Sequence, residues 1–217
     1  MKPTHRKLLA LVLALVLTLS LLPTVALAAE TGYESTATLT FTNAGITETV
    51  AGTGYAISGT TLTVSSSGVY TVTGSCSEGN IVVKKGTTGV VLILEDLDLS
   101  CSSTAPLACN KTTETTLYIS GTVTLTDKEN PADETSTDTA VADAFEGAAI
   151  KVKSGGTLVI EGDGTLTADG SACKNGIKGG ATANLTVDMT GKLIVTAANN
   201  GLASDGSLVV KQGTLDV

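Results

Sequence analysis

The chain has 217 residues, a formal net charge of −8 and a single histidine, His5. Because no histidine follows it, residues 29–217 cannot form a Ser-His-Asp or Cys-His catalytic group or an imidazole zinc site. The acidic charge balance also argues against nucleic acid as a partner.

Residues 1–28 have the pattern of a secretory signal peptide. Lys2, Arg6 and Lys7 precede an apolar run over residues 8–22, and the small-residue site Ala-Leu-Ala ends at Ala28. This run is shorter than the roughly 20 residues of a membrane-spanning helix. We therefore expect cleavage after Ala28, a secreted or cell-surface protein and no membrane span. The remaining chain has ten Lys and Arg against 21 Asp and Glu, a formal charge of −11.

Beyond residue 29 the composition predicts an all-β fold. Short stretches such as Thr61–Val64 alternate Thr with apolar residues, and Gly or Ser-Gly separates them. We expect residues 29–77 to form an N-terminal β cap and the first rung of a stack, because an open rung would leave an exposed strand edge.

One apolar pattern recurs from residue 80 onward. Its first apolar position recurs at spacings of 26, 43, 27 and 25 residues, at Ile81, Leu107, Ile150, Ile177 and Leu202. Three short strands per repeat of about 25 residues predict a right-handed, single-stranded parallel β-helix over residues 78–217. Its rungs would enclose a shared apolar interior. Since the sequence stops directly after a strand, we expect the natural array to continue beyond residue 217.

The long spacing of 43 residues contains an acidic insertion at residues 127–146. Seven carboxylates and one lysine, Lys128, lie within it. Neighbouring carboxylates repel one another unless water or a divalent cation screens them. The insertion is therefore either a flap ordered by calcium or a solvated loop.

Four cysteines stand at positions 76, 101, 109 and 173. In an oxidising compartment an even number is compatible with disulfides. The 25-residue spacing between Cys76 and Cys101 would place them on adjacent rungs and favours a bond between this pair. The alternative, four small buried thiols, stays open.

Several of these runs resemble a known group, the calcium-binding, carbohydrate-binding parallel β-helix family of bacterial secreted proteins, which is similar in fold to polysaccharide lyase family nine. The resemblance lies in residues 63–74, 79–83 and 91–100, and in the runs Asn-Gly-Ile-Lys at 175–178 and Asn-Gly-Leu-Ala-Ser at 200–204, which resemble a repeated Asp-Gly-Ile-Lys-Ser motif. It implies binding of plant cell-wall polysaccharide, including acidic pectic chains, with calcium at surface sites. Here Asn replaces the Asp of the motif and brings no charge.

Calcium takes about six to eight oxygen ligands, which a stacked coil could supply by repeating one turn on successive rungs. Asn and Asp are also ordinary turn residues, so each candidate has a purely structural alternative. The candidate Ca²⁺ ligands are Asp169, Asn175, Asn199, Asn200 and Asp205, together with Asp143 and Glu146 of the insertion.

Lysines follow the recurring apolar positions at Lys84, Lys151, Lys153 and Lys178. We take Lys151, Lys153 and Lys178 as candidate ligand-binding residues, because ammonium groups pair with uronate carboxylates. Solvated lysines that protect a strand edge are the alternative. The chain has no Trp, so sugar binding should depend on charge, calcium and hydrogen bonds rather than on broad stacking platforms.

These observations favour a secreted, monomeric, non-catalytic and calcium-dependent binding module for plant cell-wall or other acidic polysaccharide. A structural or adhesive cell-surface repeat is the alternative. A calcium-dependent pectate lyase, with Lys178 or a neighbour as base, is favoured less, and no catalytic residue is assigned.

Overall fold

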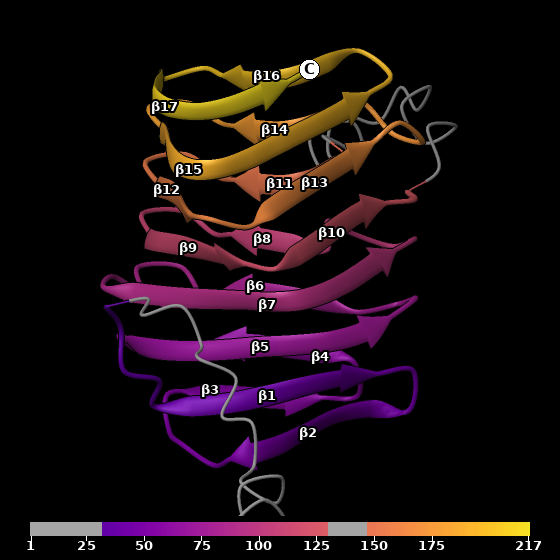
Figure 1. The fold of residues 1–217 in the computed structure, drawn as a ribbon, viewed down its shortest axis with the longest axis vertical. Coiled ribbons are helices and arrows are strands. Elements are labelled where there is room, and N and C mark those ends of the chain that lie inside the picture. Colours follow the sequence, from indigo (N-terminus) through magenta and orange to yellow (C-terminus); the bar gives the residue numbers. More distant parts are fainter. Residues whose placement is uncertain (1–31, 130–146) are drawn as a thin grey trace, which may run out of the picture. The chain divides into compact units, whose positions relative to one another are not determined.

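The computed structural model describes residues 32–129 and 147–217, and every regular element within these two ranges is a β-strand (Figure 1). The predicted signal peptide lies outside the described residues. So do Asp143, Glu146 and most of the acidic insertion. Within the described ranges there is no helix long and apolar enough to cross a membrane.

The strands follow one another along the chain with short turns between them. They are β1 (Ala37–Thr42), β2 (Gly45–Val50), β3 (Tyr55–Ser58), β4 (Thr61–Val64), β5 (Gly68–Cys76), β6 (Asn80–Val83), β7 (Val90–Cys101), β8 (Leu107–Cys109), β9 (Glu114–Ser120), β10 (Thr122–Asp127), β11 (Ala148–Val152), β12 (Thr157–Gly162), β13 (Thr165–Gly170), β14 (Asn175–Gly179), β15 (Asn184–Ala197), β16 (Asn200–Ser204) and β17 (Ser207–Asp216).

These strands form two sheets between which the chain alternates. A seven-stranded sheet has the order β16-β14-β11-β8-β6-β4-β3. A ten-stranded sheet has the order β10-β13-β15-β12-β9-β7-β5-β1-β2, with β17 paired to β15. All pairs are parallel except β1 with β2 and β3 with β4. These two antiparallel pairs lie at the same end of the stack (Figure 1).

The predicted alignment of the repeats is confirmed in the seven-stranded sheet. Ile81 stands opposite Leu107, Leu107 opposite Ile150, Ile150 opposite Ile177, and Ile177 opposite Leu202. The spacing of the apolar positions therefore gave the correct strand register, including the step across the acidic insertion.

The prediction of a right-handed β-helix with three strands per rung is wrong. β7, with 12 residues, and β15, with 14, run unbroken through the positions at which separate second and third strands were expected. β7 pairs with both β9 and β10, and β15 pairs with both β12 and β13. With the pairs β9–β12 and β10–β13, the hydrogen bonding closes into a six-stranded parallel barrel, to which the other strands add as sheets.

A β-bulge explains why β7 does not break. Asp96 adopts a positive φ of 44°, and the register between β5 and β7 shifts by one residue at this point. Asp is one of the few residues other than Gly that tolerates this backbone region. A bulge bends a strand and lets pairing continue beyond the extra residue. The polar Glu95-Asp96 pair therefore marks a bend within one strand and not a turn between two.

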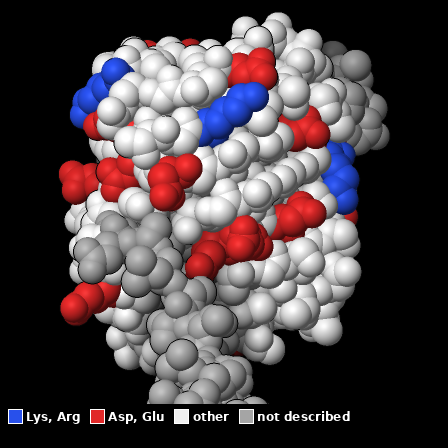
Figure 2. Space-filling model, in the orientation of Figure 1, with Lys and Arg blue, Asp and Glu red and all other residues white. Residues whose placement is uncertain are grey.

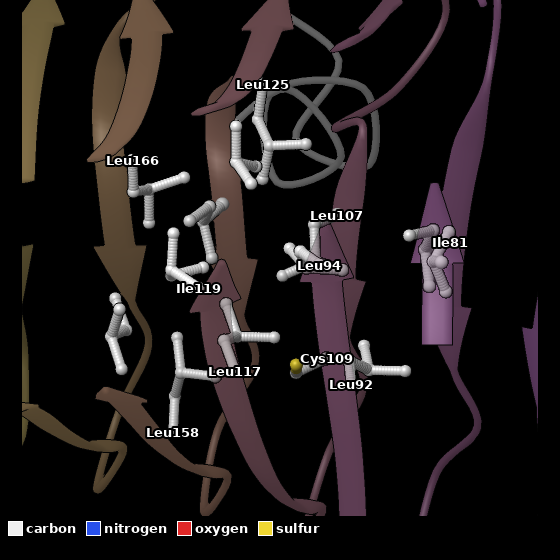
Figure 3. Close-up of a cluster of buried hydrophobic side chains, with 14 of the residues drawn as sticks. Ile81, Leu92, Leu94, Leu107, Cys109, Leu117, Ile119, Leu125, Leu158 and Leu166 are labelled. Atoms are coloured by element: carbon white, nitrogen blue, oxygen red, sulfur yellow. The ribbon is translucent and has the colours of Figure 1, made fainter. Parts of the chain in front are cut away.

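Side chains that point inward from both sheets form one apolar core. Leu92 and Leu94 of β7 lie beside Leu117 and Ile119 of β9, and Leu107 faces them from the seven-stranded sheet (Figure 3). All five are fully buried. Burial of one such side chain stabilises a protein by about 1.5–3 kcal/mol, so the repeated apolar positions hold the coils together.

The predicted disulfide between Cys76 and Cys101 is not formed. All four cysteines are buried free thiols. β5 and β7 are offset by 22 residues before the bulge and 23 after it, so Cys76 stands opposite Leu99. Cys101 stands opposite Asp127 of β10. A spacing of 25 therefore places Cys101 two residues beyond the partner position of Cys76.

Candidate functional site

The predicted ligand-binding residues Lys151 and Lys178 lie side by side on the outer face of the seven-stranded sheet. They are Cα partners on β11 and β14. Ile150, Val152 and Ile177, their chain neighbours, are buried, and alternate side chains of a strand point to opposite faces. Both lysines are half-buried at their base and project outward.

Lys153 lies just beyond the end of β11, in a column of turn residues. The backbone N–H of Lys153 donates to the carbonyl of Cys109, as that of Lys84 does to Val64, at 2.8 Å in each case. Lys84 and Lys153 therefore occupy equivalent positions on different coils of the stack, and both are exposed.

Two further lysines of this corner were missed in the sequence. Lys85 follows Lys84 directly, and the carbonyl of Lys111 accepts the N–H of Gly86 at 3.0 Å, which places the turn of Lys111 against that of Lys85. Each lies four residues after a recurring apolar position, Ile81 or Leu107, so their shared place in the repeat was a signal that could have found them. We call the six residues together the lysine strip: Lys84, Lys85, Lys111, Lys151, Lys153 and Lys178.

A polar hollow opens at one end of the lysine strip. It has a volume of about 460 Å³ and is lined by residues 65–67 and 84–88, which include Lys84, Lys85 and three serines. Hydroxyl and ammonium groups without apolar surface around them suit a hydrated anionic ligand better than an apolar one.

The lysine strip contrasts with the rest of the molecule. It holds six of the ten lysines and arginines of residues 29–217, all of which lie in the described ranges. On the ten-stranded sheet, Lys192 pairs with Asp216 at 3.3 Å and Lys211 with Asp188 at 3.0 Å. Figure 2 shows that acidic side chains gather on the face of that sheet. On the strip, the Asp205 carboxylate binds the Lys178 ammonium group at 2.7 Å; the Asp205 side chain is 57% exposed and that of Lys178 only 12%.

The structure separates the candidate calcium ligands. Asn200 begins β16 and Asp205 follows its end, so their backbones are roughly 16 Å apart at about 3.3 Å per residue. Calcium–oxygen bonds are only about 2.4 Å long. One ion cannot bind both residues.

The Oδ1 atoms of Asp169 and Asn175 already accept hydrogen bonds. The Asp169 carboxylate accepts from the Ser171 N–H at 2.9 Å and the Thr196 hydroxyl at 2.7 Å. Partial burial opposes the ionisation of Asp169, but these hydrogen bonds outweigh it and lower its pKa. Asn175 is 1% exposed, and its amide bonds to Gly147 and Asn200.

The described candidates therefore do not fit a calcium site. The backbone N–H groups of Asn199 and Asn200 both donate hydrogen bonds to the carbonyl of Lys174, which is an ordinary turn contact. Within the described ranges no three His, Cys, Asp or Glu side chains lie close enough to hold a metal ion. Asp143 and Glu146 lie outside those ranges.

A buried carboxyl group at Asp127 was not predicted. Asp127 ends β10 and is 0% exposed, and its Oδ1 accepts the N–H of Glu129 at 2.8 Å. Its Oδ2 has no hydrogen-bond partner of normal geometry among the described residues. Burial raises the pKa of Asp127, although the N–H of Glu129 and the thiol of Cys173 act in the opposite direction. Burial, and the charge of Asp127, raise the pKa of Cys173 to about 12.

Comparison with known proteins gives two matches. A family model described as "Carbohydrate-binding domain-containing protein" matches residues 58–217. A solved structure of a polysaccharide lyase-like protein from C. thermocellum, a gadolinium derivative, is similar in fold, with a TM-score of 0.58 and 22% identity. The similarity covers 82% of this chain and 68% of that chain. No match was found among curated proteins.

Proposed function

We propose, from the premise that this chain belongs to the carbohydrate-binding domain-containing family, that it is a binding module for acidic polysaccharide and that the lysine strip is its binding surface. The observation that carries the proposal is the concentration on one strip of six of the ten cationic side chains of residues 29–217, which have a formal charge of −11. Uronate carboxylates are the groups of a polysaccharide that ammonium groups bind directly.

The spacing of the strip suits a polymer. Neighbouring parallel strands lie about 4.8 Å apart, so Lys151 and Lys178 present two charges at that interval. Lys84 and Lys153 extend the array along the turns of the same sheet. Several weak, exposed contacts in a row give a long anionic chain an affinity that one contact could not.

Secretion is part of this proposal. The signal-peptide pattern of residues 1–28 supports export to the outside of the cell or to its surface, where polysaccharides occur. Four reduced cysteines are compatible with export because each of them is buried.

Calcium dependence and lyase activity are separate questions. The described candidate ligands do not fit a calcium site, so we derive no step of binding through calcium and keep its contribution as a prediction. We assign no catalytic residue. Asp205, the carboxylate beside Lys178, forms an ion pair.

Calorimetric titration with oligogalacturonate tests the proposal with a matched pair of variants. The strip variant carries Lys111→Gln and Lys153→Gln, and the control carries Lys192→Gln and Lys211→Gln. Both lose two charges, but only the first loses them on the strip. We expect the strip variant to bind roughly tenfold more weakly, about 1.4 kcal/mol, and the control to bind like the parent. Equal weakening in both would show a general charge effect and contradict the proposal.

Two additions to the titration decide the remaining alternatives. EDTA measures the calcium contribution, and ultraviolet absorbance of the unsaturated product measures lyase activity. Loss of binding in EDTA would support a calcium site, and product formation would favour the enzyme. If the parent protein binds no acidic polysaccharide, the structural or adhesive alternative is supported instead.

A further inference from the structure

One carboxylate stands in a column of turn positions that elsewhere carries lysine. Asp205 follows β16, and its backbone N–H donates to the carbonyl of Gly179 at 3.0 Å. The N–H groups of Lys84 and Lys153 make the same contact with the strand end of the neighbouring coil, so Asp205 occupies their position on a later coil. The column therefore changes from cationic to anionic along the lysine strip.

The Asp205 carboxylate lies directly on a lysine of the strip. Its Oδ1 accepts a hydrogen bond from Nζ of Lys178 at 2.7 Å. The side chain of Lys178 is only 12% exposed, whereas that of Asp205 is 57% exposed. An ammonium group with little access to water is unfavourable without an anion, but an exposed carboxylate is solvated when it leaves. Lys178 therefore needs a partner more than Asp205 does.

Release of Asp205 from Lys178 requires no change of the fold. The N–H bond to Gly179 holds the backbone of Asp205 in place, so rotation of the side chain alone moves the carboxylate into water. An ion pair with an exposed partner is also weak. A second carboxylate can therefore compete with Asp205 for the Lys178 ammonium group.

A uronate carboxylate offers Lys178 the same chemistry as Asp205. Asp205 is fixed beside Lys178 by the chain, so its effective concentration there is high and an isolated anion competes poorly with it. A polysaccharide that is already bound to Lys84 and Lys153 holds its next carboxylates near Lys178, at an effective concentration that is also raised. Such a polymer can replace Asp205 where a single anion cannot.

We infer that Asp205 is an internal competitor of the ligand: it neutralises Lys178 in the free protein and gives it up to a polysaccharide that other lysines of the strip already bind. The inference rests on the proposed function and adds a regulation of the same site. A positioning residue would have the opposite effect, because it would hold Lys178 ready for the ligand and raise the affinity. The sign of the change on removing the Asp205 charge separates the two roles.

Calorimetric titration with oligogalacturonate in a double-mutant cycle tests the inference. The cycle compares the parent with Asp205→Asn, with Lys178→Gln and with the variant that carries both. Asparagine keeps the size of the aspartate side chain and removes its charge. The matched control is Asp188→Asn, because Asp188 also forms an ion pair, with Lys211 at 3.0 Å, but on the ten-stranded sheet.

We expect Asp205→Asn to bind oligogalacturonate roughly three- to fivefold more tightly than the parent, and Asp188→Asn to change the affinity less than about 1.5-fold. The gain should vanish when Lys178 is also replaced. Weaker binding of Asp205→Asn would make Asp205 a positioning residue, and equal gains in both Asp→Asn variants would show an effect of net charge alone. Either result, or a gain that survives Lys178→Gln, would overturn the inference.

Failure of the proposed function gives a different result. If neither the parent nor Asp205→Asn binds oligogalacturonate, the proposed function fails and this inference fails with it. If the parent binds oligogalacturonate and Asp205→Asn binds it equally well, the lysine strip stays the binding surface and only the inference fails.

Discussion

Lys151 of β11 and Lys178 of β14 are direct partners in a parallel sheet, two cations held side by side on an acidic protein. The Asp205 carboxylate, 2.7 Å from the Lys178 ammonium group, reduces the repulsion between these like charges. An anionic polymer on the lysine strip would reduce it further.

Binding to the lysine strip should depend strongly on salt. Between about 0.05 and 0.5 M sodium chloride, ions screen exposed charges over progressively shorter distances. We expect the affinity for oligogalacturonate to fall steadily across this range. The strip variant should show a smaller salt dependence, because fewer ammonium groups contribute. An affinity that does not change with salt would mean that hydrogen bonds, and not charge, dominate recognition.

Asp127→Asn should stabilise the protein at neutral pH. Burial raises the pKa of Asp127 in the folded state above its unfolded value, so its favourable contribution is complete at pH below the unfolded pKa and is lost as pH rises through the folded one. The amide keeps the Oδ1 acceptor for Glu129 and removes the buried charge.

Urea unfolding at about pH 3.5 and pH 7 measures this effect. We expect the variant to gain about 1–2 kcal/mol over the parent at pH 7 and little at pH 3.5. The exposed Asp163→Asn is the control and should change little at either pH. A variant that is less stable than the parent at pH 7 would show that the Asp127 carboxylate is well solvated or paired.

Asn175→Ala should destabilise the stack. The Asn175 amide donates to the carbonyl of Gly147 at 3.1 Å and accepts from the Asn200 amide at 3.2 Å, so it links three successive coils. Its loss removes two hydrogen bonds between coils, which together contribute about 1–3 kcal/mol. Thermal and urea unfolding should show the loss, with exposed Asn199→Ala close to the parent. Equal stability of both variants would show that water replaces the lost contacts.

All four cysteines should behave as inaccessible thiols. In the folded protein we expect no reaction with a thiol-specific reagent, and four equivalents after denaturation in guanidinium. The high pKa of Cys173 adds to this inertness. Intact mass should not change on reduction. A gain of about 2 Da on treatment with a reductant would reveal a disulfide.

The apolar spacing was sufficient to predict how coils align but not how strands end. Ile81, Leu107 and Ile150 align as their positions in the repeat indicated, because an inward-facing apolar residue cannot slip by one position without leaving the core. Three short strands per repeat were predicted, but β7 runs through the polar pair Glu95 and Asp96 without a break. Only the backbone of Asp96, with its positive φ, shows that β7 continues.

The candidate site was predicted in part for the same reason. Lys151 and Lys178 follow aligned apolar positions, so the sequence indicated that they would be neighbours. Lys111 lies 26 residues after Lys85, the same spacing as between Leu107 and Ile81, so the alignment could have identified this pair as well. Asn200 and Asp205 are close in sequence but lie at opposite ends of a strand, so one calcium ion cannot bind both; the prediction of calcium binding stays a prediction.

Differential acetylation of lysines, with and without oligogalacturonate, tests the location of binding most directly. Mass spectrometry follows each lysine separately, and Lys84, Lys85, Lys111 and Lys153 are all exposed and reactive in the free protein. We predict protection of these four by the bound oligosaccharide, with Lys192 and Lys211 acetylated as before. Protection of Lys192 and Lys211 with the lysine strip left reactive would contradict the account.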